Sequence, residues 1–107
     1  MPENTPAEAY EETITRLDEQ LDECDADIDY DTVSDILTIS FENGSKLIIN
    51  YQAASDQLWL AARSGGFHYN YDAASGHWLN DRTGEDFLAE LSRLATAQAG
   101  EEICFVR

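Results

Sequence analysis

The sequence is short of basic residues. It has 6 Lys and Arg against 22 Asp and Glu, which gives a net charge of −16 over 107 residues. A surface with so little positive charge repels nucleic acid and anionic membranes, and it attracts cations and basic protein surfaces. We therefore expect no nucleic-acid partner and no membrane partner.

Cysteine and long hydrophobic runs are also scarce. The two cysteines, Cys24 and Cys104, have no CxxC or metal-ligand spacing, which predicts free thiols in a reducing compartment. No apolar run approaches the ~20 residues of a membrane-spanning helix. The N-terminal stretch MPENTPAEAY lacks the features of signal and transit peptides. We expect a cytoplasmic protein.

Motifs of catalysis are missing as well. The chain has no P-loop and no GxGxxG, and His68 and His77 have no Cys or Ser set beside them in sequence. A hydrolase with paired carboxylates stays open, but a raised carboxylate pKa needs burial, and every acidic cluster here has the composition of a solvated surface. We predict no catalytic residues and no enzyme activity.

What is present is the composition of a folded protein. Hydrophobic residues make up 43% of the chain and aromatic residues 10%, with no linker, repeat or low-complexity tract. A chain of this length can bury one core without disulfides or metals. We expect a single domain over residues 1–107.

A helix is predicted from about Pro6 to Glu23. Apolar residues recur there at steps of 4, 3, 4 and 3, which is one stripe of an amphipathic helix: Tyr10, Ile14, Leu17, Leu21 and Cys24.

The period then changes from 3.6 to 2, which indicates strands. Asn43-Gly44, the strongest short hairpin signal, separates Ile36–Phe41 from Lys46–Tyr51. A second hairpin turns at Arg63–Gly66, between Gln57–Ala62 and Phe67–Tyr71, and a further strand surrounds His77–Asn80.

The last element is a second amphipathic helix. Thr83 is its predicted N-cap, with Asp86 three residues on as a relaxed capping box, and Gly100 ends it. Two terminal helices can cover one face of an antiparallel sheet of about six strands. The predicted fold is therefore an α+β two-layer sandwich.

The stretch DADIDYD, residues 25–31, places four aspartates at every second position. Along a strand they would project from one face with neighbours ~7 Å apart, too far for one chelating cage. The pattern also fails as an EF-hand, because Tyr30 stands where the loop needs Gly and Ile36 where it needs Glu. Shallow sites for hard cations, a basic partner surface, and a solvated face kept for solubility all remain open.

Trp59 belongs to the outward side of its predicted strand, with Gln57, Ala61 and Arg63. An exposed Trp among polar residues indicates a contact surface. The alternative is a Trp that long neighbouring side chains half-cover.

Three stretches carry a resemblance to a known family: LTISFENGSKLIIN, QLWLAARSGGFHY and HWLNDRTGEDFLAELS. Together with the first helix they resemble the frataxins, specifically the bacterial CyaY branch, over nearly the whole chain. Tyr51 stands where the family usually has a basic residue, and Ala53 and Ala54 replace the proline that normally follows.

The resemblance implies a frataxin-like α+β sandwich and a role in iron–sulfur cluster biogenesis. It implies weak binding of Fe²⁺ and Fe³⁺ through an acidic ridge, which by position comprises Asp18, Glu19, Asp22, Glu23, Asp25, Asp27, Asp29 and Asp31. It also implies docking on the cysteine desulfurase and the iron–sulfur scaffold machinery. The family's exposed sheet patch corresponds to Asn50, Gln52, Gln57 and Trp59.

The expected function is an iron-binding regulator of cluster assembly. The alternative is a purely electrostatic adaptor whose acidic surface binds a basic partner and meets metal only incidentally. A ferroxidase-like enzyme ranks below both, because no closed metal site is visible in the sequence. We expect a monomer, with metal-induced oligomers left open.

Overall fold

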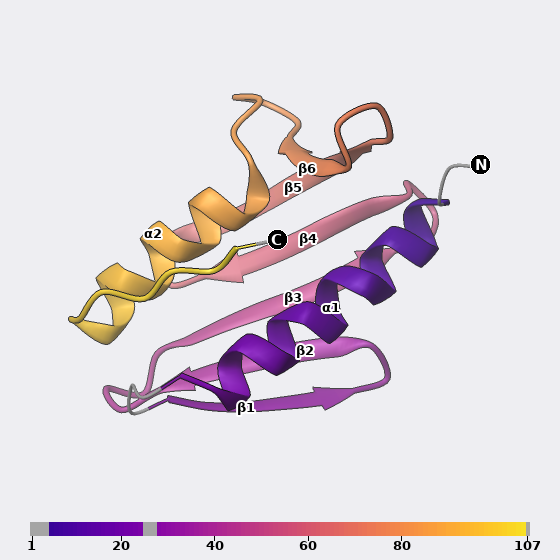
Figure 1. Ribbon diagram of the computed structural model, residues 1–107. Coiled ribbons are helices and arrows are strands. Elements are labelled where there is room, and N and C mark those ends of the chain that lie inside the picture. Colours follow the sequence, from indigo (N-terminus) through magenta and orange to yellow (C-terminus); the bar gives the residue numbers. More distant parts are fainter. Residues whose placement is uncertain (1–4, 25–27, 107) are drawn as a thin grey trace.

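The computed structural model describes residues 5–24 and 28–106, and these form two helices and one sheet. Helix α1 (Pro6–Asp22) comes first, and helix α2 (Phe87–Ala99) comes last. Between them run β1 (Ile28–Val33), β2 (Ile36–Phe41), β3 (Lys46–Gln52), β4 (Gln57–Ala62), β5 (Gly65–Asp72) and β6 (His77–Asn80). The six strands pair antiparallel in sequence order. Both helices lie on one face of this sheet (Figure 1), which confirms the predicted two-layer α+β sandwich.

The core fills the space between the helices and the sheet. One side of each strand from β2 to β5 supplies fully buried side chains, which include Leu37, Ile39, Leu47, Ile49, Leu58, Leu60 and Tyr69. The alternate residues of these strands point away from the helices. We call this second side the open face.

Helix α1 has a complete N-terminal cap. Thr5 precedes Pro6, and the Thr5 side chain accepts from the Glu8 amide at 3.2 Å while the Glu8 carboxylate accepts from the Thr5 amide at 3.1 Å. The helix ends at Asp22, so Cys24 lies beyond it and does not extend the predicted apolar stripe. Both cysteines are free thiols.

The hairpins lie where the sequence predicts them, but their turns differ in detail. The Asn43-Gly44 turn is present, with Gly44 at φ 86°. The β4–β5 turn is shorter than predicted, because Gly65 already pairs with Ala62 across the strands. The β1–β2 turn consists of Ser34 and Asp35, which both have positive φ without being glycine.

The predicted N-cap of the second helix was wrong. Asp86, not Thr83, caps α2, and its side chain accepts from the Ala89 amide at 3.2 Å. The cause is Asn80, whose side-chain oxygen accepts from the Arg82 and Thr83 amides at 2.8 and 3.2 Å. Thr83 therefore belongs to this turn, and the helix begins after it.

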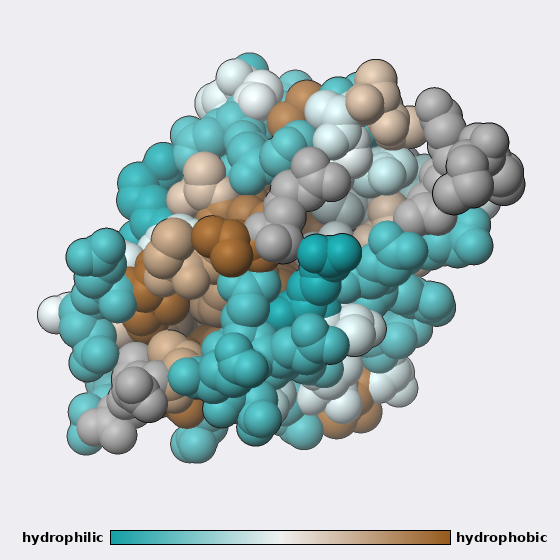
Figure 2. Space-filling view, in the orientation of Figure 1, coloured by the Kyte–Doolittle hydropathy of each residue, from teal (hydrophilic) through white to brown (hydrophobic). Residues whose placement is uncertain are grey.

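The segment after α2 lies between the two helices (Figure 1), and its Ile103 and Phe105 are buried. The Gln20 amide holds its end, because it donates to the Val106 carbonyl at 2.7 Å and accepts from the Val106 amide at 2.8 Å. Figure 2 shows hydrophobic colour between the helices and mostly hydrophilic colour over α1. Neither described helix is long and apolar enough to cross a membrane.

Candidate functional site

The acidic residues at the end of α1 form the first part of the candidate site. We call Asp18, Glu19, Asp22 and Glu23 the helix row. No basic residue lies in the last turn of α1, so these charges face the negative end of the helix dipole without compensation, at a cost of about 0.3–1 kcal/mol each when exposed. Asp18 is half-buried, and its carboxylate accepts from the Thr32 hydroxyl at 3.0 Å.

The aspartates of β1 form the second part of the candidate site. They lie on the side of β1 that faces away from the helix row. Tyr30 and Thr32 point towards the helices, opposite Ile39 and Leu37 of β2. Asp29 and Asp31 alternate with them and therefore project from the open face, where both are exposed. We call this pair the strand row. Asp25 and Asp27 lie outside the described residues.

Tyr30 lies beside the helix row, on the side of β1 that faces the helices. Partial burial raises the pKa of its phenol, and the charges of Asp22 and Asp18 raise it further. The phenol is protonated at neutral pH, as in any tyrosine, and can donate to the helix row.

The two rows offer oxygen ligands but no closed metal site. Among residues 5–24 and 28–106, no three carboxylate, imidazole or thiol side chains come close enough together to hold a metal ion. The ion pairs of the same residues also leave both rows out, since they involve only His68, His77 and Arg93 with carboxylates elsewhere. The rows are therefore open and uncompensated in the described part of the chain.

The four residues of the predicted sheet patch come together on the open face. Asn50 lies directly opposite Trp59, and Gln52 lies directly opposite Gln57, so they make two cross-strand pairs between β3 and β4. Because alternate residues share a face, the two pairs lie side by side.

Trp59 is exposed, as its alternation predicts. Its side chain keeps 36% of its accessible surface. The indole stacks on the His68 ring, with centroids 4.3 Å apart and planes at 17°, and its N–H donates to the Gln57 side chain at 3.2 Å. The ring is therefore held in place on the open face and is not covered by core residues.

Three apolar residues of the open face were missed as site candidates: Val33, Ile36 and Ile48. They and Trp59 are the large hydrophobic side chains that the described strands expose. Ile48 lies in a cross-strand row that runs from Asp31 through Thr38 and Ile48 to Ala61 and Gly66. The period-2 pattern that exposes Asp29 and Asp31 also exposes Val33, so the signal was available.

Tyr51 lies on the opposite side from the sheet patch. Its ring packs towards α1, 5.3 Å from that of Tyr10, and its hydroxyl donates to Asp56 at 2.6 Å. Tyr51 therefore does not contribute to the open face.

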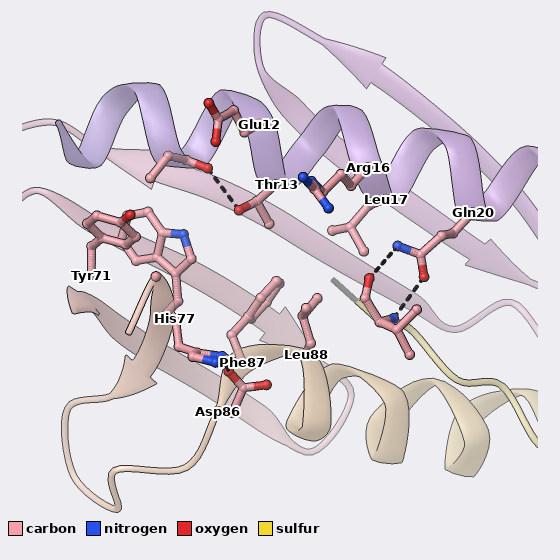
Figure 3. Close-up of a pocket in the computed structure, with 14 residues that line it drawn as sticks. Glu12, Thr13, Arg16, Leu17, Gln20, Tyr71, His77, Asp86, Phe87 and Leu88 are labelled. Carbon is pink, nitrogen blue, oxygen red and sulfur yellow. Dashed lines mark hydrogen bonds and ion pairs between the residues drawn. The ribbon is translucent and has the colours of Figure 1, made fainter. Parts of the chain in front are cut away.

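A groove of about 180 Å³ lies between the two helices (Figure 3). Thr13, Arg16 and Leu17 of α1 face His77 and Phe87 across it. The His77 ring of β6 contacts the carboxylate of Asp86, the N-cap of α2, at 2.7 Å, so this contact ties β6 to the start of α2.

One buried carboxylate also escaped the sequence analysis. Glu90 is 4% exposed and accepts hydrogen bonds from the Tyr69 hydroxyl and from the Asn80 amide at 3.0 Å, and Arg93 lies 3.2 Å from its other oxygen. These contacts satisfy both oxygens, and they fasten α2 to β5 and β6.

Comparison with known proteins agrees with the fold. A family model described as the frataxin-like domain matches residues 2–101. The chain is also similar to the solved frataxin from Psychromonas ingrahamii, a protein presented as a model for stability modulation within the CyaY protein family. That structure is 36% identical, covers 97% of this chain and 100% of its own, and superposes with a TM-score of 0.85.

Proposed function

Because the chain belongs to the frataxin-like family, with a role in iron–sulfur cluster assembly in the broad sense, we propose that it is a cytoplasmic, monomeric regulator of that assembly. It binds Fe²⁺ and Fe³⁺ weakly through the two acidic rows and docks on the cysteine desulfurase and its scaffold partner. Frataxins are in general regulators associated with iron, not enzymes.

The chemistry of the acidic rows supports weak iron binding. Carboxylate oxygens are hard ligands, and they suit iron along with Mg²⁺, Ca²⁺ and Mn²⁺. Because the described carboxylates do not converge in threes, iron would keep most of its water ligands there. Such a site holds its metal loosely enough to release it to another protein.

The observation that carries the docking proposal is that Asp31 and Trp59 project from the same open face. Three strand spacings separate their strands, which is about 14–15 Å. A typical interface covers about 800 Å² on each partner, so one partner surface can contact both. Its basic residues would meet the strand row while apolar groups meet Ile48 and Trp59.

The second candidate function is the electrostatic adaptor. It is favoured by the same lack of a closed metal site among residues 5–24 and 28–106, because an acidic edge can steer a basic partner without any metal. The two functions differ in whether loss of iron binding accompanies loss of partner binding.

The test measures anaerobic Fe²⁺ affinity and desulfurase affinity in the same variants. One variant carries Asp29→Asn with Asp31→Asn, and a second neutralises the helix row with Asn and Gln. The control is Glu101→Gln with Glu102→Gln, which removes two exposed charges beyond α2.

We expect both affinities to fall in the row variants and to stay nearly unchanged in the control. If only desulfurase binding falls, the adaptor function holds. If the control loses as much as the row variants, binding follows net charge and neither function is correct.

A further inference from the structure

A histidine and an aspartate face each other at the β5–β6 side of the open face, away from both acidic rows. Asp81 follows β6, and its amide donates to the His68 carbonyl at 2.9 Å, which fixes the two residues across the strand pair. The His68 Nδ1 and an Asp81 carboxylate oxygen are 3.9 Å apart. Their side chains are 44% and 30% exposed, so the space between them is open to solvent.

Neighbouring side chains orient both groups. The Trp59 indole stacks on the His68 ring at 4.3 Å. Gln57 places its side-chain nitrogen 3.4 Å from the Asp81 carboxylate, and its oxygen accepts from the Trp59 N–H at 3.2 Å. Hydrogen bonds fix the direction of ligating carboxylates in metal sites, and the stack on Trp59 restricts the orientation of the His68 ring.

We infer that His68 and Asp81 form an open, two-ligand site for a divalent cation that prefers imidazole nitrogen, such as Zn²⁺ or Co²⁺. Zinc binds histidine nitrogen and carboxylate oxygen at about 2.0–2.2 Å, and at a tetrahedral angle the two atoms are then about 3.4 Å apart. A small rotation of the two exposed side chains would shorten the observed separation of 3.9 Å between the His68 nitrogen and the Asp81 oxygen to this value. Water completes the coordination.

This site differs in chemistry from the acidic rows. The rows carry only oxygen ligands, which hard cations such as Mg²⁺ and Ca²⁺ share, whereas imidazole selects transition metals. Millimolar Mg²⁺ should therefore occupy the rows and leave the His68–Asp81 site free.

The site also gives the open face a means of regulation. A bound cation would lie beside Trp59 and add positive charge where a basic partner surface is expected, so it should weaken docking. This step alone rests on the proposed function, and the site itself does not.

The test is a Co²⁺ titration in millimolar Mg²⁺, followed by the histidine ring signals in NMR and by tryptophan fluorescence. We expect the His68 signals to broaden before those of His77, and the Trp59 emission to be quenched. Trp59→Phe should remove that quenching and leave the broadening of His68. Equal broadening of both histidines would overturn the site.

Variants assign the ligands. His68→Gln and Asp81→Asn should each weaken Co²⁺ binding by about tenfold or more, as losses at a metal site do. Asp72→Asn is the control, because Asp72 lies in β5 on the same face as His68. It should change the Co²⁺ affinity less than about twofold, because salt screens the charges of surface residues that do not contact the metal. Urea unfolding checks that all three variants fold.

Unchanged affinity in His68→Gln, or equal losses in Asp72→Asn and Asp81→Asn, would show that Co²⁺ follows the protein's overall charge. Zn²⁺ should also weaken desulfurase binding to the wild type and not to His68→Gln. If Co²⁺ binds as expected while docking is insensitive to Zn²⁺, the site stands and its regulatory role is wrong.

Discussion

Trp59 and Trp78 lie on opposite faces of the sheet, and their side chains are 36% and 4% exposed. Truncation of a buried aromatic residue costs about 3–5 kcal/mol. Trp59→Ala should therefore cost far less than this in urea unfolding, since the side chain lies on the open face, where it stacks on His68 and makes one hydrogen bond, yet it should weaken partner binding.

Trp78→Ala is the matched control, and it should reach the full cost of a buried truncation. If Trp59→Ala proves as destabilising as Trp78→Ala, the side chain belongs to the core and the open face is assigned wrongly.

Tyr69 gives a second test, because its hydroxyl donates to the buried Glu90 carboxylate. Burial first, and the Glu90 contact next, raise the pKa of the Tyr69 phenol above its usual range. The folded protein keeps this proton after the unfolded chain has lost it near pH 10. The contribution is therefore fully present below about pH 10 and is lost as pH rises towards the raised value.

Tyr69→Phe should lower the free energy of unfolding at pH 7 by about 1–3 kcal/mol, because Glu90 loses a buried donor. It should also make stability fall less steeply above about pH 10 than in the wild type. Urea unfolding at several pH values measures both effects. An unchanged alkaline slope would show that Tyr69 does not carry this linkage.

At the scale of elements, β1 is an edge strand with like charges on the open face. Asp29 and Asp31 are about 7 Å apart along the strand and repel by about 0.6 kcal/mol in a water-like dielectric. Asp29→Asn with Asp31→Asn should therefore raise the melting temperature by a few degrees at low ionic strength, and salt should shrink the gain. A double variant that melts lower than the wild type in low salt would contradict the repulsion.

The elements were predictable where one local signal decides the structure. Asn43-Gly44 specifies its hairpin, and the apolar stripe of Tyr10, Ile14, Leu17 and Leu21 specifies α1. Where two side chains could each cap the same helix, the sequence did not show which one does. Asn80 closes the turn through Thr83 and so leaves the cap of α2 to Asp86.

The candidate site was predictable only in part, because the polar residues of the open face were named from the sequence and its apolar residues Val33, Ile36 and Ile48 were not. Strand alternation was enough to place Trp59 outward. The division of the acidic residues by β1 was not foreseen, because it depends on where α1 crosses that strand. The β1–β2 turn was not predictable either, because Ser34 and Asp35 adopt positive φ although neither is glycine.

At the scale of the whole molecule, most of the negative charge lies in the first third of the sequence, although the net charge of the chain is −16. Residues 1–35 hold 13 of the 22 acidic residues and one basic residue, Arg16. The helices cover one face of the sheet. The open face presents the strand row, the exposed apolar side chains and Trp59. The fold thus leaves a charged and partly apolar surface available to a basic partner.

The most direct test of this account is the footprint of the cysteine desulfurase on the isotopically labelled protein, measured by NMR line broadening. Docking through the open face predicts the strongest effects at Asp31, Thr38, Ile48, Asn50 and Trp59, with α2 and the groove between the helices nearly unaffected. A footprint confined to α2 or to that groove would contradict it.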